Sequence, residues 1–66
     1  MKIAVNDTPT DLPNHATVAD LLEHLGKTGT PCAVERNGEL VPWRDHDAVA
    51  LQPDDSIEIV TLVGGG

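Results

Sequence analysis

The residues with the clearest chemical potential lie at the end of this chain, where a strand-like run is followed by three glycines. The run covers residues 57–63, and the glycines are Gly64, Gly65 and Gly66. Glycine has no side chain to pack and loses more backbone entropy on ordering than any other residue. The ending therefore predicts either a frayed terminus without a role or a narrow, flexible tail that another molecule binds.

Other residues that could do chemistry are few and scattered. Cys32, the one cysteine, could carry a persulfide, but it falls on the apolar side of a predicted strand, where a free thiol packs as a small hydrophobe. We therefore expect a structural role for it. His15, His24 and His46 lack the paired spacings of zinc ligands, so we expect three surface residues and no metal site.

The single aromatic residue and a group of aspartates precede the last strand. We expect Trp43 to cover one end of the small core rather than to contact a substrate. Asp45, Asp47, Asp54 and Asp55 form an acidic zone. Solvation of a small fold is the simpler explanation for this zone, and electrostatic steering of a partner is the alternative.

Size and composition limit the classes of function. The 66 residues predict one domain, residues 1–63, with a flexible tail, residues 64–66. Such a small core leaves little room for the cleft of roughly 300 Å³ that a small-molecule enzyme needs, so we expect no enzyme. A formal charge of −7 argues against nucleic-acid binding, which uses clustered Lys and Arg. One cysteine, with no signal peptide or long apolar span, predicts a cytoplasmic protein without a membrane segment. We expect a monomer when it is free.

The elements that must position the tail follow from hydrophobic periodicity and turn chemistry. Thr17 is a predicted helix N-cap with Asp20 three residues later, an apolar stripe follows, and Gly26 suits the helix end. Asn37 and Gly38 predict a two-residue hairpin turn. The expected strands are 2–6, 10–12, 32–36, 39–41 and the run from residue 57.

One helix this short cannot be stable alone and must lie on a sheet. A crossover through the helix can place the first and last strands side by side and parallel. The sequence therefore predicts an α+β fold of the β-grasp type: a mixed sheet of four to five strands with one main helix packed on one face.

Alternation divides the last strand between two environments. We assign Ile57 and Ile59 to the core beneath the helix. Val60 and Leu62, with Glu58, then lie on the open face of the sheet. An exposed apolar pair beside a free tail is typical of a docking surface, although single exposed apolar residues are also common.

Five segments of the chain together follow the pattern of one known family: residues 1–6, 17–22, 33–38, Val41-Pro42 and the terminal glycines. They resemble the ThiS family of sulfur carriers in thiamine biosynthesis, and the resemblance spans essentially the whole chain. One turn departs from it: Pro53-Asp54-Asp55 stands where the family usually has an Asp-Gly-Asp type of sequence. Asp54 must then adopt a backbone angle that glycine takes freely.

The resemblance implies a chemical role for the tail. A ThiF-like adenylating enzyme, using ATP with Mg²⁺, would activate the carboxylate of Gly66, while Gly64 and Gly65 would let the backbone pass into the partner's active site. A sulfur donor such as a cysteine desulfurase would convert the terminus to a thiocarboxylate. A ThiG-like thiazole synthase would then receive the sulfur. The chain itself would be a protein co-substrate that holds no cofactor.

Three alternatives remain open from the residues alone. The chain could carry sulfur for another pathway, of the molybdopterin or cysteine type. It could be a ubiquitin-like modifier that is conjugated to lysines through Gly66. It could also be a β-grasp interaction module that never uses its terminus.

Overall fold

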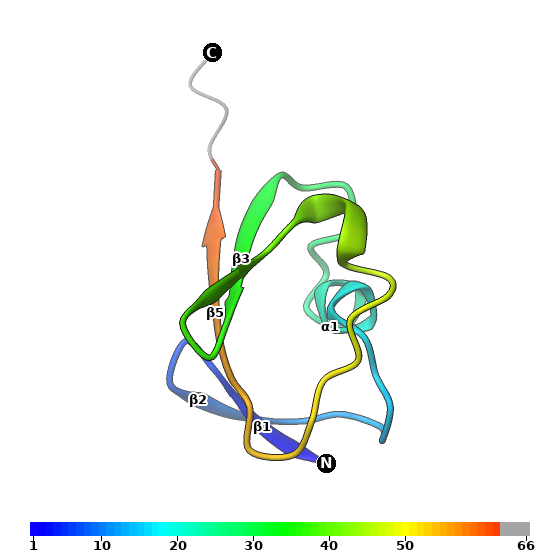
Figure 1. Ribbon diagram of the computed structural model, residues 1–66, viewed down its shortest axis with the longest axis vertical. Helices are drawn as coiled ribbons and strands as arrows, with labels where there is room; N and C mark the ends of the chain where they lie inside the picture. Colours follow the sequence, from blue (N-terminus) through cyan, green and yellow to red (C-terminus); the bar gives the residue numbers. More distant parts are fainter. Residues whose placement is uncertain (63–66) are drawn as a thin grey trace.

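The computed structural model describes residues 1–62, which form five strands, one α-helix and one 3₁₀ turn (Figure 1). The predicted boundary between a domain ending at 63 and a glycine tail lies outside the described residues. The elements are β1 (Lys2–Val5), β2 (Thr8–Asp11), α1 (Val18–His24), β3 (Cys32–Arg36), β4 (Glu39–Val41), η1 (Trp43–Asp45) and β5 (Ser56–Thr61).

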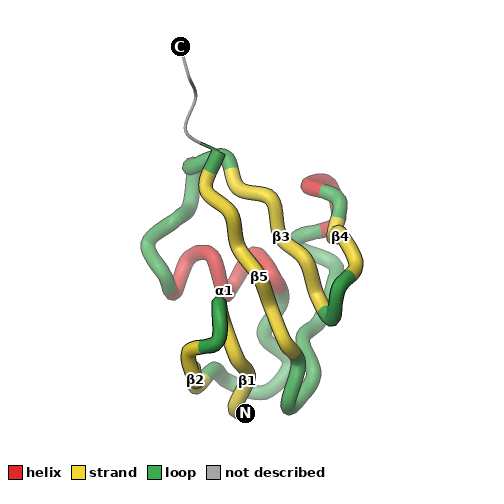
Figure 2. Tube along the Cα trace, turned by 90° about the vertical axis from the view of Figure 1, so that its left-hand side faces the viewer, coloured by secondary structure: helices red, strands yellow, loops and turns green. Residues whose placement is uncertain are grey.

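All five strands form one sheet in the order β2-β1-β5-β3-β4. The sheet is mixed, since β1 pairs with β5 in parallel and the other pairs are antiparallel. Figure 2 views the sheet from its open face, with α1 behind it. This arrangement confirms the predicted α+β, β-grasp architecture.

The first hairpin turns earlier than its sequence predicts. Asn6 and Asp7 both have positive φ, 48° and 66°, and Val5 pairs with Thr8 across them. This is the two-residue turn that suits the twist of a hairpin. The returning strand therefore begins at Thr8 rather than at Thr10. Pro9 fits within it because β2 lies at the edge of the sheet, where a missing N–H costs no ladder bond.

The second hairpin agrees with its prediction. Asn37 and Gly38 have φ values of 52° and 85°, as a two-residue turn of type I′ requires. The register then pairs Arg36 with Glu39 and continues to the end of β4 at Val41.

The helix begins at the predicted cap. The Asp20 amide donates to Thr17 Oγ1 at 3.1 Å, and the Thr17 amide donates to Asp20 Oδ2 at 2.9 Å. This reciprocal capping box satisfies two amides at the helix start. Gly26, with a φ of 71°, ends the helix in the left-handed conformation that we expected.

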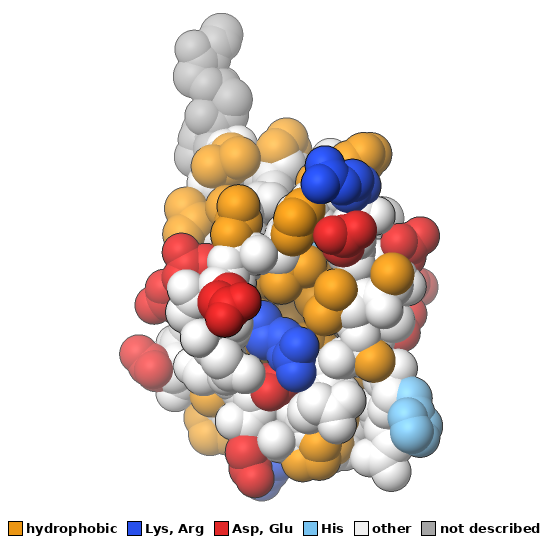
Figure 3. Space-filling model, in the orientation of Figure 1, with side chains coloured by type: hydrophobic (Ala, Val, Ile, Leu, Met, Phe, Trp, Pro, Cys, Tyr) orange, Lys and Arg blue, Asp and Glu red, His pale blue; other side chains and the backbone are white. Residues whose placement is uncertain are grey.

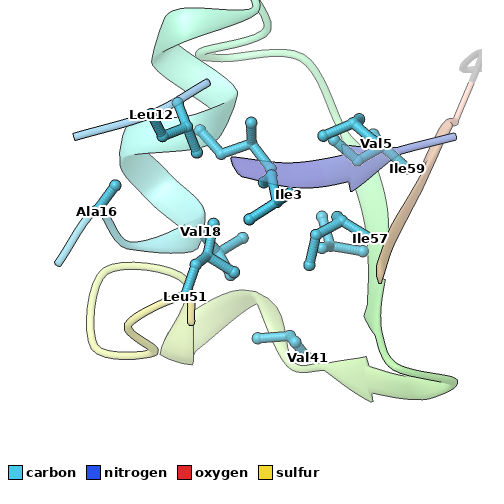
Figure 4. Close-up of a cluster of buried hydrophobic side chains, with 11 residues drawn as sticks. Ile3, Val5, Leu12, Ala16, Val18, Val41, Leu51, Ile57 and Ile59 are labelled. Carbon is cyan, nitrogen blue, oxygen red and sulfur yellow. The ribbon is translucent and has the colours of Figure 1, made fainter. Parts of the chain in front are cut away.

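The core lies between α1 and one face of the sheet. Figure 4 shows side chains from the strands, the helix and the loop before β5 pointing toward one another. Leu51, which is 1% exposed, adds to this core from the loop before β5. In that loop, Ala50 forms an isolated β-bridge with Thr17. The buried hydrophobic residues are Ile3, Val5, Leu12, Ala16, Val18, Leu21, Val34, Val41, Leu51, Ile57 and Ile59.

Two predictions about side chains near η1 are wrong. Trp43 does not cover the core, because its side chain is 84% exposed. His46, expected at the surface, is 8% exposed, whereas His15 and His24 are exposed as predicted. His46 Nε2 lies 3.1 Å from the Val41 carbonyl oxygen, so the imidazole is buried with a hydrogen-bond partner.

The acidic zone also divides differently from the prediction. Asp54 is exposed and has a φ of 69°, the glycine-like angle that we expected. Asp55 is buried rather than solvated, at 6% exposure. Its carboxylate accepts hydrogen bonds from Arg36 Nε at 2.8 Å, Asn37 Nδ2 at 3.0 Å and the Gln52 amide at 2.8 Å. Asp55 therefore joins the β3–β4 hairpin to the start of β5.

The pKa of Asp55 lies below its ordinary value. Burial raises the pKa of this carboxyl, but the hydrogen bonds from the Gln52 amide, Asn37 and Arg36, with the charge of Arg36, outweigh burial. The ionised form is thus favoured by folding. Its contribution to stability is complete above the ordinary Asp pKa of about 3.9, and it is lost as the pH falls from there through the lowered folded value.

We therefore predict that Asp55→Asn lowers the free energy of unfolding by about 1–3 kcal/mol at neutral pH, because three donors lose a charged acceptor. The difference should stay constant between about pH 7 and about pH 5 and shrink toward about pH 3. Urea unfolding at these three pH values measures it. Asp54→Asn is the matched control and should change stability by less than about 0.5 kcal/mol. A deficit in Asp55→Asn that did not shrink at low pH would show that the ionised carboxylate is not its source.

Candidate docking site at the end of the last strand

The strand that leads to the glycines is held on both edges. On one edge, β1 pairs with β5 through Ala4 with Ser56 and Val5 with Ile57. On the other edge, β3 pairs with β5 over five consecutive positions, from Cys32 with Thr61 to Arg36 with Ile57. A strand with ladders on both sides has little freedom to shift or twist. The direction in which β5 ends is therefore fixed by the sheet.

A side chain extends the contact between β1 and β5. Asn6 Nδ2 donates to the Ile59 carbonyl at 3.2 Å, and the Ile59 amide donates to Asn6 Oδ1 at 2.9 Å. The side-chain amide of Asn6 thus takes the place of a backbone peptide group and continues the hydrogen-bond ladder beside β5, beyond the end of β1. Beyond the strand, the Leu62 amide donates to the Pro31 carbonyl at 2.9 Å. The chain is hydrogen-bonded up to the last described residue.

The two faces of β5 differ as the alternation predicts. Ile57 and Ile59 are 1% and 7% exposed, whereas Val60 and Leu62 are 59% and 51% exposed. Glu58 is exposed as well. The exposure of these three side chains agrees with the prediction, and their docking role stays a prediction. Gly64, Gly65 and Gly66, the predicted tail residues, lie outside the described residues.

The sheet register adds neighbours that the sequence does not identify. Ala33 pairs with Val60, Glu35 pairs with Glu58, and Leu40 pairs with Glu35 from the adjacent strand. Leu40 is 65% exposed. Strand alternation alone cannot say which side chains lie beside Leu40. The register shows that Leu40 shares a face of the sheet with Glu58 and Val60 of β5. We define the open face as Ala33, Glu35, Leu40, Glu58 and Val60. Leu62, just beyond β5, also lines the groove on the other side of the strand.

A groove lies on the other side of β5, beside the helix. It has a volume of about 560 Å³ and is lined mainly by apolar groups, among them Leu22, Cys32, Trp43 and Leu62. Cys32 is partly buried and packs against the core, in keeping with the structural role predicted for it. In Figure 3 hydrophobic side chains gather around the end of the molecule where β5 finishes. Apolar surface therefore lies on both sides of β5 near its end.

The described residues show no metal-binding group and no membrane segment. Within residues 1–62, no three His, Cys, Asp or Glu side chains are grouped so that they could hold a metal ion. In the same range, no helix is long and apolar enough to cross a membrane.

Comparisons with known proteins agree with this geometry. The sequence profile of the ThiS family matches residues 1–66. The crystal structure of the thiamine biosynthesis protein ThiS from Geobacter metallireducens superimposes with a TM-score of 0.84 at 29% identity, and the match covers 100% of both chains. An uncharacterized protein, ycf40, from Porphyra purpurea is 30% identical over 100% of this chain and 93% of its own length.

A further relative is much longer. The thiazole synthase of Magnetococcus marinus is 42% identical over 66 residues, which are 100% of this chain but 20% of that protein. The chain thus spans about a fifth of the length of that relative. Because the family profile covers every residue and the solved structure shares the whole fold, this chain belongs to the ThiS family of thiamine biosynthesis.

Proposed function

We propose that the chain is a sulfur carrier whose terminal Gly66 carboxylate is activated and converted to a thiocarboxylate by partner enzymes. One observation carries the proposal: the sequence ends in three glycines, separated by two residues from Thr61, the last residue of a central strand that is paired with β1 at its start and with β3 through to its end. The groove in the described residues, about 560 Å³, is lined mainly by apolar groups, so this small fold is better suited to docking than to chemistry of its own. It can present its terminus to an active site elsewhere.

The chemistry of the terminus sets what the partners must do. A carboxylate is a poor acyl donor because oxide is a poor leaving group. The Gly66 carboxylate oxygen attacks the α-phosphorus of ATP on an adenylating enzyme, with Mg²⁺ on the phosphates, and pyrophosphate leaves. A persulfide sulfur then attacks the acyl carbon and AMP leaves. The new bond joins carbon to the outer sulfur of the persulfide. A thiol then cleaves the persulfide's own S–S bond, forms a disulfide with the donor's inner sulfur, and releases the thiocarboxylate.

The acceptor is the part of the proposal that the relatives support. In the Magnetococcus marinus protein, a segment that matches this chain belongs to a thiazole synthase. We infer that the thiocarboxylate of this chain supplies sulfur to a thiazole synthase. The adenylating enzyme and the sulfur donor follow from the chemistry of activation.

The docking role belongs to the same proposal. Three glycines offer a partner no side chains to recognise, so the partner must recognise the domain that precedes them. Val60 and Leu62, with Glu58, provide exposed surface immediately before the tail. Half-exposed apolar side chains that become buried at an interface contribute to affinity through the water that they release.

The tail test uses Gly65→Leu. The domain should keep its urea midpoint, since the substitution is in the tail, but adenylation should fall at least roughly 100-fold because the side chain obstructs a narrow channel. ATP–pyrophosphate exchange with the adenylating enzyme measures it. Thr28→Leu, an exposed loop position, is the control and should be activated normally. Normal activation of Gly65→Leu would contradict the narrow channel.

The docking test uses the double variant Leu40→Ser, Val60→Ser, because both side chains are exposed and neither lines the groove, whereas Leu62 does. Loss of two apolar side chains from an interface should raise the KM for the carrier at least roughly tenfold, with kcat retained at saturation. Trp43→Ser removes an even more exposed apolar side chain from the groove side and should leave KM unchanged. If Trp43→Ser raised KM and the double variant did not, docking would be on the groove.

Cys32→Ser separates a structural thiol from a sulfur relay. The variant should still acquire sulfur at Gly66, because Cys32 packs against the core and a partner supplies the persulfide. Intact mass after incubation with ATP, the adenylating enzyme and a sulfur source measures the transfer. Failure of thiolation in a variant that is still folded and adenylated would assign the relay to Cys32.

A further inference from the structure

The edge of β5 that faces β1 is bonded to a neighbouring backbone only as far as Ile57. The parallel pairing ends with Val5 opposite Ile57, and the backbone amide of Asn6 donates to the Ile57 carbonyl at 2.8 Å. In a parallel ladder the next bond would come two residues farther along, from residue 8. Thr8 instead belongs to β2 and pairs with Val5. The backbone of β1 therefore leaves this edge before β5 ends at Thr61.

The side chain of Asn6 fills the position that the backbone leaves. It donates to the carbonyl of Ile59 at 3.2 Å and accepts from the amide of Ile59 at 2.9 Å, as the peptide groups of a neighbouring strand would. Asn6 is exposed and is not part of the buried core, so its side chain contributes these two bonds rather than packing. Among residues 1–62, it is the last hydrogen-bond partner that the β1–β2 hairpin offers along β5.

Beyond Ile59, β5 is bonded along its other edge. Cys32 on β3 pairs with Thr61, and the Leu62 amide donates to the Pro31 carbonyl at 2.9 Å. A strand that is bonded along one edge twists more freely than one bonded along both, as two-stranded ribbons show. Asn6 therefore restricts the singly bonded part of β5 to the residues after Ile59, which lead to the glycines.

We propose that Asn6 is a positioning residue for the activation of Gly66: through Ile59 it fixes the direction in which β5 presents the terminal carboxylate to the adenylating enzyme. The inference rests on the proposed function. The carboxylate oxygen must align with the α-phosphorus of ATP, and the rate of such a step falls steeply when the reacting atoms are misplaced. Without the two bonds to Ile59, a smaller fraction of the bound carrier is aligned. The register of β3 with β4 and β5 still holds the open face, so binding is retained.

The test replaces two asparagines by glycine. Asn6→Gly keeps the positive φ of 48° without strain and removes the bonds to Ile59. Asn37→Gly is the matched control. Asn37 is also exposed, begins the other two-residue turn with a φ of 52°, and bonds through its side chain to Asp55 and to the Ser56 amide at the start of β5. Both variants add the same freedom to the unfolded chain, so they separate the end of the strand from its start.

Kinetics distinguish positioning from stability and from docking. In ATP–pyrophosphate exchange with the adenylating enzyme, Asn6→Gly should lower kcat about fivefold or more and change the KM for the carrier less than about twofold. Asn37→Gly should keep both values within about twofold of the unaltered chain, at a temperature where urea unfolding shows both variants to be folded. An unchanged kcat in Asn6→Gly, an equal loss in both variants, or a raised KM with unchanged kcat would overturn the inference and leave the carrier assignment intact.

Amide hydrogen exchange gives a second readout that needs no enzyme. The Leu62 amide keeps the Pro31 carbonyl as its partner in both variants, so its hydrogen exchange reports motion of the strand end rather than the loss of an acceptor. It should accelerate about threefold or more in Asn6→Gly and stay unchanged in Asn37→Gly. Equal rates in the two variants would overturn the inference. If the unaltered chain supported no ATP–pyrophosphate exchange, the proposed function would be wrong, and the role of Asn6 in activation with it.

Discussion

The parallel pairing of β1 with β5 is the contact on which the candidate site depends. It joins residues about fifty positions apart in the chain, through Ala4 with Ser56 and Val5 with Ile57, and it places β5 in the middle of the sheet. A slip of one residue would turn Ile57 and Ile59 out of the core and bring Glu58 and Val60 into it. The core therefore sets both the register of β5 and the side chains that the open face presents.

Polar contacts strengthen the same strand just before its start and in its middle. Asp55 binds Arg36, Asn37 and the Gln52 amide just before β5 begins. The Asn6 side chain pairs with the backbone of Ile59 farther along. Both groups hold β5 to its neighbours through side chains, where the backbone ladder is interrupted by turns. In the proposed function, this fixed strand is what presents the terminal glycines to a partner.

The local elements could be predicted because each has a strong local cause. Asn37-Gly38 requires a tight turn, Thr17 and Asp20 form a capping box, and alternation buries Ile57 and Ile59. These preferences agree with the packing, so the helix, the hairpin and the faces of the last strand were all predictable.

What could not be predicted depends on distant contacts. His46 can be buried because distant groups satisfy its polar atoms. Its Nε2 has the Val41 carbonyl as a partner, and its backbone carbonyl accepts a hydrogen bond from the Ala19 amide. Asp55 is buried because Arg36 and Asn37 arrive from another hairpin. The core is filled by aliphatic side chains from the strands, the helix and the loop before β5, and Trp43 lies outside it. The like-charged pair of Glu35 and Glu58 becomes visible only with the register of β3 against β5.

The intact mass of the chain after incubation with ATP, the adenylating enzyme and a sulfur source tests the central claim most directly. The account predicts a product in which one terminal oxygen is replaced by sulfur, with fragmentation placing the change at Gly66. An unchanged mass under conditions in which the enzyme is active, or branched conjugates joined to lysines in its place, would contradict it.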